Sequence, residues 1–311
     1  MTTVVSLGSI NVDRVQYISS DKIRSLENRY GWFPSMGQTV RVGEVPRLID
    51  AEDSENFIGG KGANQAVAAA NIASDVTLFG SVGSDREKYD VLSTLSSRGV
   101  TVDAVFESDM ETGKAYIFVD ETGESWIAIV GGANTAVNSE YIDRHYEDIC
   151  SADALLLQNE IPTEPVVSLL NRLSHEPSRP TIICNPAPAD GVAPLLDSSA
   201  VDVLVVNESE HDALTRECHR FDGTLIKTQG GDDVLVSGDK EFRITPPEAD
   251  PIDTTGAGDV FCGYVAAHLG ADRDIRQAVK DATVAATRST EVEGAQEAIS
   301  NLELHRQRID Q

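Results

Sequence analysis

Basic residues are scarce in this chain. Lysine and arginine together number 25 among 311 residues, against 51 aspartates and glutamates, and the formal charge is −26. Because nucleic acids and anionic membranes would repel such a surface, the composition argues against either as a partner. The carboxylates are spread along the whole chain, and repulsion of this size is best tolerated where salt screens it. We therefore expect a protein of a salt-rich cytoplasm, such as that of a halophilic archaeon.

The chain also lacks long apolar runs and clustered cysteines. No run of about eighteen apolar residues occurs, and Met1 leads almost directly into a strand-like segment, so we expect no membrane span or signal peptide and predict a cytoplasmic location. The four cysteines are scattered, without a C-x-x-C pair, which argues against a disulfide framework or a zinc site. Aromatic residues make up 5% and hydrophobic residues 41% of the chain, as in a globular α/β protein.

Short apolar runs that end in polar residues alternate with segments of helix length. Such runs occur at 4–10, 76–80, 154–158, 181–184, 201–206 and 224–227. The alternation predicts an open parallel sheet covered by helices. The polar residues that follow these strands, Glu160 and Asn207 among them, should gather along the edge where ligands bind.

Residues 253–259 precede an apolar-faced segment, 260–269, that predicts a helix. Gly256, Ala257 and Gly258 carry almost no side chain, so their backbone N–H groups and the helix dipole favour a bound anion. Asp259 would lie in the first turn, where its carboxylate can accept a proton from an attacking hydroxyl. This combination suits phosphoryl transfer. The alternative is that the glycines and the aspartate merely cap a buried helix.

A second glycine-rich helix start lies at 59–64. Lys61 and Asn64 would project from it toward Asn11 and Asp13, which follow the first strand. Four converging polar groups suggest a polyhydroxylated ligand. The alternative is a turn without a ligand.

Residues 115–119 and 125–130 flank a turn and predict a β-hairpin, which we interpret as part of a lid. Tyr116, Phe118 and Trp126 are too many large apolar residues for a two-stranded element left bare in water. A sugar can cover part of one face, and the same hairpin of a second copy would cover the other, which predicts a homodimer. Residues 19–49 are polar and irregular and predict a loop-rich insertion. If the protein is a monomer, this insertion would cover the second apolar face of the hairpin.

Five motifs occur in the order typical of the PfkB sugar-kinase family, and the chain resembles the ribokinase branch of that family from Val4 to about Gln296. The motifs lie at 8–13, 59–66, 185–189, 207–210 and 253–259. The resemblance implies a ribokinase-like open, mostly parallel sheet with helices on both faces and a small β-sheet lid. It further implies a single kinase domain over 1–311, with lid segments near 12–18, 38–58 and 113–131.

The resemblance also implies a role for each matching residue. Asp259 would be the catalytic base, with the N–H groups of Gly256, Ala257 and Gly258 as the anion hole. The sugar would be held by Asn11, Asp13, Gly60, Lys61, Asn64, Glu160 and Asp259. ATP would contact Asn207, Thr228, Gly230, Gly231 and Gly258. Without the resemblance, Glu160 would be a solvated carboxylate and residues 228–231 a plain turn.

Two cation sites follow from the same resemblance. Glu210 matches an element concerned with Mg²⁺ and phosphate, and one carboxylate is enough for an ion that keeps most of its waters. Taken alone, Asn207 and Glu210 are the signature of a helix N-cap with a capping box, and the two roles are compatible. Asp253 and Thr255 would help to bind a monovalent cation such as K⁺, although residues 289–293 and 297–299 depart from the family pattern.

The expected substrates are therefore ATP and ribose, which is phosphorylated on its primary hydroxyl to ribose 5-phosphate. Two alternatives remain open at this point. One is a related kinase for a nucleoside, another sugar or a sugar acid. The other is a non-catalytic sugar sensor on the same fold, against which the intact Asp259 and its glycines argue.

Overall fold

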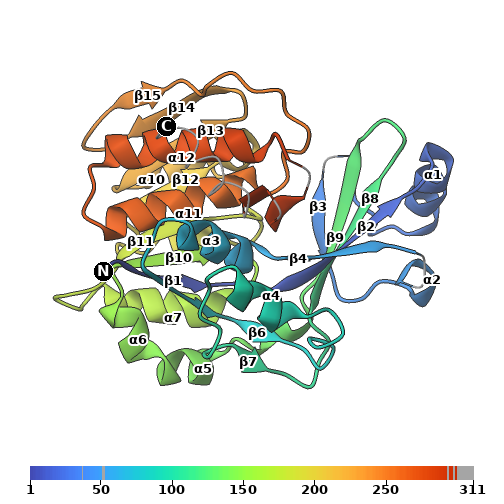
Figure 1. The fold of residues 1–311 in the computed structure, drawn as a ribbon, viewed down its shortest axis with the longest axis horizontal. Coiled ribbons are helices and arrows are strands. Elements are labelled where there is room, and N and C mark those ends of the chain that lie inside the picture. The colour runs from blue at the N-terminus through green and yellow to red at the C-terminus, as the bar shows by residue number, and fades with distance from the viewer. Residues whose placement is uncertain (37, 51–52, 293, 297, 300–311) are drawn as a thin grey trace.

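The chain folds into two β-sheets of different size, with helices on both faces of the larger one (Figure 1). A computed structural model describes residues 1–36, 38–50, 53–292, 294–296 and 298–299. The strands of the larger sheet lie in the order β5 (Asp75–Phe79), β1 (Thr3–Leu7), β10 (Ala154–Gln158), β11 (Thr181–Asn185), β12 (Val203–Val206), β13 (Thr224–Gln229), β14 (Asp232–Ser237) and β15 (Phe242–Ile244). From β5 to β13 they run parallel, and β14 and β15 add an antiparallel hairpin at one edge.

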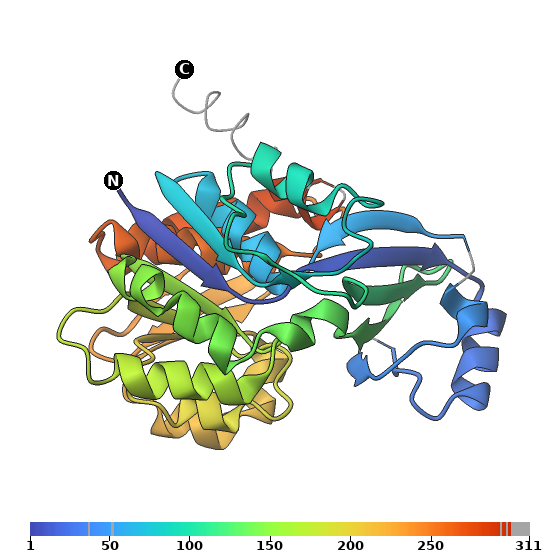
Figure 2. The same ribbon diagram turned by 90° about the horizontal axis from the view of Figure 1, so that it is seen from below.

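Both faces of the larger sheet are buried because its central strands are apolar at nearly every position. All five residues of β10 are buried, and Leu156 packs into one core while Leu155 and Leu157 pack into the other. The first core is covered by α3 (Lys61–Ala70), α4 (Val91–Ser97), α11 (Ala257–Gly270) and α12 (Ile275–Ser289). The second is covered by α5 (Ser139–Arg144), α6 (Tyr146–Ser151), α7 (Thr163–Leu173), α8 (Ala193–Leu196) and α10 (Thr215–Arg220), while α9 (Glu208–Ala213) follows β12 (Figure 2).

The smaller sheet grows out of the edge at which the parallel strands end. Its strands lie in the order β3 (Thr39–Val42), β9 (Ser125–Val130), β8 (Gly113–Val119), β2 (Asn11–Tyr17) and β4 (Glu55–Gly59). Strand β2 follows β1 closely, and β4 runs directly into α3, so the sheet stands to the right of the larger one in Figure 1. The predicted hairpin is confirmed, since β8 and β9 pair antiparallel with Tyr116 opposite Ala128. A ladder of β6 (Ser81–Val82) with β7 (Phe106–Glu107) and a 3₁₀ turn, η1 (Gly132–Ala136), complete the fold.

The prediction of a loop-rich, irregular insertion at 19–49 is wrong. This segment contains α1 (Ser20–Arg29), strand β3 and α2 (Arg47–Asp50). The Ser19 side chain caps α1 by accepting from the Lys22 backbone N–H at 3.3 Å. The helix was missed because a surface helix that packs on one side needs only a narrow apolar stripe, and polar residues dominate the rest.

Helix α1 covers the outer face of the smaller sheet. Its buried residues, Ile23 and Leu26, pack in one cluster with Tyr116, Phe118 and Trp126. The three aromatic residues are 4%, 0% and 3% exposed within the single chain. Of the two covers considered for this apolar face, the 19–49 insertion is thus the one found within the single chain, and the sequence argument for a homodimer loses its main support.

The predicted fold class, a mostly parallel α/β sheet with a small additional sheet, is confirmed. The single domain over 1–311 and its lid segments stay a prediction, and residues 51–52 of one segment lie outside the described part of the chain. Among the described residues, no helix has both the length and the apolar character needed to cross a bilayer. The cytoplasmic location stays a prediction.

Candidate active site

A cavity of about 570 Å³ opens between the edge of the larger sheet and the inner face of the smaller one. Its volume is in the usual range of small-molecule sites. The structure brings together around it all the residues predicted to hold a sugar, namely Asn11, Asp13, Gly60, Lys61, Asn64, Glu160 and Asp259. The opposite wall is apolar and consists of Ala115, Ile117, Ile127 and Ile129.

The residues predicted for the nucleotide and the cations only partly reach this cavity. Asn207, Glu210, Thr255 and Gly256 line it. Ala257, Gly258, Thr228, Gly230, Gly231 and Asp253 are not among its lining residues. Residues 228–229 end β13 and residues 230–231 form the turn after it, and β13 pairs with β12 one position further along the same edge.

Helix α11 begins at the wall of this cavity. Its N-cap, Gly256, has a φ of +79°, and a side chain there would lie 2.7 Å from the Ala295 Cβ, so glycine is required on both grounds. Among the described residues, the N–H groups of Gly256 and Gly258 donate to no backbone carbonyl, whereas that of Ala257 donates to the Thr254 oxygen over 3.3 Å. Two of the three predicted anion-hole donors are therefore open to a ligand.

The Asp259 carboxylate lies in the first turn of α11 and is only 5% exposed. Its Oδ2 accepts a hydrogen bond from the Asn64 Nδ2 at 3.1 Å, and its Oδ1 accepts from the Gln65 Nε2 at 3.0 Å. Both donors come from the first turns of α3. Buried carboxylates without partners are costly, and these two bonds keep the side chain in one orientation.

Close packing around glycine places α3 beside α11. A side chain at Gly62 would lie 2.7 Å from the Gly8 Cα, at the end of β1. A side chain at Gly263 would lie 2.6 Å from the Ala68 Cβ, on α3. The small residues on these helices thus allow the two helix starts to meet, as the alanine-rich sequence predicts.

The polar groups at the end of β1 are tied to two other strand ends. The Asn11 Oδ1 accepts from the Asn134 Nδ2 at 2.7 Å, and the Asn134 Oδ1 accepts from the Ile10 backbone N–H at 2.9 Å. Glu160, after β10, accepts from the Ser9 hydroxyl and from the Lys61 backbone N–H, the latter at 3.2 Å. Asn134, in η1, was not predicted from sequence. Only its place in a Gly-Gly-Ala-Asn turn could have pointed to it.

Five ionisable groups line this cavity, namely Asp13, Lys61, Glu160, Glu210 and Asp259. Burial, and then the nearby Glu160 and Asp259 carboxylates, raise the pKa of Asp13 to about 7, although Lys61 acts in the opposite direction. Burial alone would lower the pKa of Lys61, but Asp259, Glu160 and Glu210 outweigh it and raise that pKa. The ammonium of Lys61 is therefore the fixed positive charge among the carboxylates.

Asn207 and Glu210 form the predicted capping box at the start of α9. The Asn207 Oδ1 accepts from the Glu210 backbone N–H at 2.8 Å, and the Glu210 Oε2 accepts from the Asn207 backbone N–H at 2.9 Å. Burial raises the pKa of Glu210. One of its oxygens remains for a hydrated cation at the cavity, so the side chain fits the predicted contact to Mg²⁺ through water. Among the described residues, no group of three histidine, cysteine or acidic side chains forms a direct metal cage.

The Asp253 carboxylate links the turn before α11 to Gly294. Its Oδ1 accepts from the Thr255 N–H and its Oδ2 from the Gly294 N–H, both at 2.9 Å. These bonds leave lone pairs on both oxygens, which suits the predicted K⁺ contact. Residues 293 and 297, where the sequence departs from the family pattern, lie outside the described part of the chain.

Sequence reasoning missed three wall residues that come from the 19–49 segment. Met36, Gln38 and Thr39 line the cavity next to the apolar wall. Recognising β3 in the sequence would have placed these residues there. Strand β3 pairs with β9, with Thr39 opposite Ile127, and Met36 and Gln38 lie just before β3.

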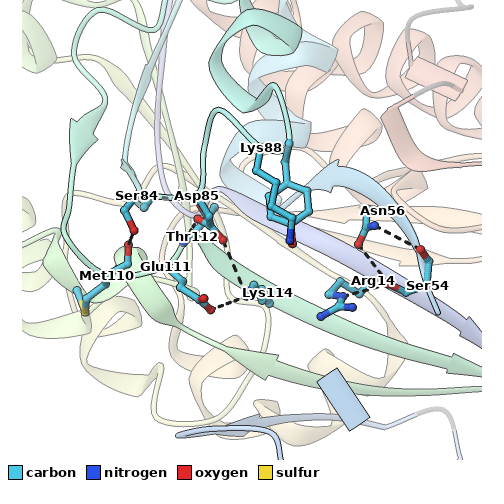
Figure 3. Close-up of polar contacts among 12 residues, drawn as sticks. Arg14, Ser54, Asn56, Ser84, Asp85, Lys88, Met110, Glu111, Thr112 and Lys114 are labelled. Atoms are coloured by element: carbon cyan, nitrogen blue, oxygen red, sulfur yellow. Dashed lines mark hydrogen bonds and ion pairs between the residues drawn. The ribbon is translucent and has the colours of Figure 1, made fainter. Parts of the chain in front are cut away.

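A second cavity, of about 530 Å³, lies on the other side of β2 and is lined in part by Lys88, Tyr89 and Arg98. Figure 3 shows the neighbouring polar cluster. The Lys88 Nζ contacts the Tyr89 hydroxyl at 2.8 Å, the Arg14 Nε donates to Ser54, and the Lys114 Nζ contacts Glu111 at 2.5 Å. Val12 faces this cavity, whereas its neighbours in the strand, Asn11 and Asp13, face the first one.

An anion-binding helix start beside a buried carboxylate, in a polar cavity at the edge of a parallel sheet, defines a small-molecule phosphotransferase. The model of the pfkB family of carbohydrate kinases matches residues 37–302. The chain belongs to this family.

The relatives are similar over nearly the whole chain. The chain is 33% identical to the ribokinase of Bacillus subtilis (strain 168) over 306 residues, which cover 95% of each protein. It is 30% identical over 321 residues to the bifunctional ribokinase/ribose-5-phosphate isomerase A of Fructilactobacillus sanfranciscensis, where the match covers 97% of this chain and 55% of that protein. The structure of Arabidopsis thaliana ribokinase complexed with ribose and ATP matches with a TM-score of 0.76 and 25% identity, over 98% of this chain and 97% of that one.

Proposed function

We propose that this protein is an ATP-dependent ribose kinase, which transfers the γ-phosphoryl group of ATP to the primary hydroxyl of ribose and yields ribose 5-phosphate. The observation that carries the proposal is the position of the Asp259 carboxylate. It lies at the open start of α11, on the wall of the cavity that also holds Asn11, Lys61 and Glu160. The ribokinase relatives support ribose as the sugar.

The cavity residues divide into sugar ligands and a water-excluding roof. Asn11, Asp13, Asn64 and Glu160 bring hydrogen-bond acceptors and donors to the cavity for the sugar hydroxyls, and Gly60 lines it without a side chain. Ile117, Ile127 and Ile129 cover the opposite side. Water excluded from this space cannot compete with the sugar for the phosphoryl group.

Asp259 accepts the proton of the attacking hydroxyl, and the helix start stabilises the transferring group. The Gly256 and Gly258 N–H groups donate to the oxygens of the phosphoryl group, and the dipole of α11 favours their negative charge. The Ala257 N–H joins them once it leaves the Thr254 carbonyl. Lys61 adds a positive charge beside the developing anion.

The nucleotide extends from this point along the sheet edge. The triphosphate passes Asn207, and the adenosine lies at the turn formed by Thr228, Gly230 and Gly231, where a side chain added at either glycine would contact nothing within 4 Å. Glu210 would hold Mg²⁺ through water, and a bound ion would supply positive charge that neutralises the phosphates. K⁺ at Asp253 and Thr255 would order the loop that precedes α11.

A nucleoside or another sugar remains the second candidate substrate. Met36, Gln38 and Thr39 extend the cavity wall beyond the sugar ligands, and they could contact a substituent on the anomeric carbon. An ADP-release assay across ribose, 2-deoxyribose, fructose, a sugar acid and adenosine decides the question. Ribose should give the highest kcat/KM. A higher value for adenosine would overturn the assignment, and no turnover with any of them would overturn the kinase itself.

Two properties of the whole molecule belong to the proposal. The charge of −26 indicates function at high salt. The homodimer through the lid stays a prediction, and any such contact has to use a surface other than the one that α1 already covers. Light scattering at micromolar concentration in molar KCl distinguishes dimer from monomer.

A further inference from the structure

The two oxygens of the Asp259 carboxylate are each held by a chain of side-chain amides. In the first chain, the Gln65 Nε2 donates to Asp259, and the Gln65 Oε1 accepts from the Gln158 Nε2 at 2.7 Å. In the second, the Asn64 Nδ2 donates to Asp259, and the Asn64 Oδ1 accepts from the Gln296 Nε2 at 2.8 Å. The four amides are at most 5% exposed. They join the catalytic helix to α3, to the end of β10 and to the segment after α12.

A guanidinium fixes the direction of the second chain. The Gln296 Oε1 accepts from the Arg98 Nη1, and arginine carries only donors. Gln296 must therefore turn its oxygen toward Arg98 and its NH₂ group toward Asn64. Asn64 must in turn present its oxygen to Gln296 and its NH₂ group to Asp259. Arg98 itself lines the second cavity, outside the active site.

These contacts suit a carboxylate that has to stay correctly oriented until a hydroxyl arrives. Each oxygen keeps a second lone pair, so an acceptor position remains on either oxygen for the substrate hydroxyl. Gln65, Gln158 and Gln296 are not among the lining residues of the active-site cavity, so they reach the reaction only through Asp259 and Asn64.

We propose that Gln65 and Gln296 are positioning residues of the phosphoryl-transfer reaction, which keep the Asp259 carboxylate aimed at the attacking hydroxyl, with Arg98 setting the polarity of the Gln296 chain. This assignment rests on the proposed function, because it requires Asp259 to be the catalytic base. It adds residues from two remote segments to the catalytic arrangement.

The decisive variant is Gln65→Glu, which keeps the size of the side chain and replaces the donor to Asp259 by a second carboxyl. The two acids then share a proton, as paired carboxylates do, and the pKa of the pair's second ionisation rises. At saturating ribose, kcat should fall about 10- to 100-fold near neutral pH. The acidic limb of the kcat profile should move up by at least about one pH unit, while the KM for ATP stays unchanged.

A second variant, Gln296→Glu, tests the other chain without touching Asp259. Its carboxylate can only accept, so the Asn64 amide has to turn over and direct its oxygen at the Asp259 carboxylate. The acidic limb should again move up, and the KM for ribose should rise because Asn64 lines the cavity. The matched control is Gln277→Glu. Gln277 donates to Asp281 at 2.8 Å on the exposed side of α12, so the same change there should leave kinetics and pH profile unaltered.

Other ionisable groups near Asp259 also contribute to the pH profile of kcat, and they are the same in the wild type and in every variant. They are Asp13 on β2, Lys61 at the start of α3, Glu160 after β10, Glu210 on α9 and Cys262 on α11. Because none of them is changed, the displacement of the acidic limb between wild type and variant reports the Asp259 environment. Saturating ribose removes the separate effect of Asp13 on sugar binding.

The outcomes separate this inference from the proposed function. An inactive wild type, or an Asp259→Asn variant with normal turnover, would refute the function and with it the base. An inactive Asp259→Asn variant together with unshifted profiles for Gln65→Glu and Gln296→Glu would refute the positioning role alone. If Gln65→Glu fails to fold, as circular dichroism would show, the Gln296→Glu profile decides.

Discussion

Asp13 gives the sharpest test of the electrostatics of this site, because its burial acts against stability while its proposed contact with the sugar would favour binding. Burial and the adjacent carboxylates raise its pKa from 3.8 to about 7. The folded protein thus retains a proton that the unfolded chain releases between about pH 4 and 7. Stability contributed by this group is therefore lost as the pH rises through that window, and the full penalty is present above pH 7.

The variant Asp13→Asn removes this penalty while keeping the shape of the side chain. A displacement of about three pH units corresponds to at most about 4 kcal/mol of unfolding free energy. Because Asp13 lines an open cavity that admits water, we expect a gain of about 1–2 kcal/mol at pH 8 and roughly a third to a half of that at pH 5. The same change should raise the KM for ribose roughly 10- to 100-fold, since hydrogen bonds to a charged acceptor are lost.

Thermal melting of both proteins from pH 5 to 8 in molar KCl measures the effect, with ribose kinetics alongside. Constant high salt keeps the overall charge repulsion from dominating the curves. Asp103→Asn, at an exposed carboxyl, is the control and should melt like the wild type throughout. The stability difference between Asp13→Asn and the wild type should increase from pH 5 to pH 8. If it did not, the crowding of acids around Asp13 would not have the energetic effect derived for it.

The remaining predictions concern the base, the sugar wall, the charge and the cover of the small sheet. Asp259→Asn should lower turnover roughly 10²–10⁴-fold with ribose binding retained, and near-normal turnover would exclude Asp259 as the base. Lys61→Ala should raise the KM for ribose far more than that for ATP, and equal changes would mean that the two sides of the site are assigned wrongly. The melting temperature should rise between dilute buffer and molar KCl, so a constant value would contradict the high-salt interpretation. Leu26→Asp should lower the unfolding free energy by about 2–4 kcal/mol because it buries a charge under the small sheet, whereas Asn28→Asp on the exposed side of α1 should have little effect.

Site residues that lie close in sequence to a glycine-rich helix start could be predicted. Contacts between site residues from distant parts of the chain could not. Lys61, Asn64 and Asp259 lie in short motifs whose local geometry already implies an open helix end. The bond from Gln296 to Asn64 spans 232 positions of sequence separation, and no local pattern announces it. The hydrogen bond from the Ala257 N–H to the Thr254 carbonyl could not be predicted either. A glycine-rich turn indicates that backbone donors are accessible, but not which of them already donate to a neighbouring carbonyl.

The small sheet shows how one missed helix changes a conclusion about assembly. The sequence argument was sound in its physics, since Tyr116, Phe118 and Trp126 do need a cover. Its first choice of cover, a second copy of the hairpin, is not needed for this face, because α1 of the 19–49 insertion supplies Ile23 and Leu26 from the same chain. The same segment continues into β3, whose Thr39 lines the cavity beneath. One insertion therefore both seals the outer face of the small sheet and forms part of the wall against the substrate, so stabilising the sheet and shaping the site are coupled within a single chain.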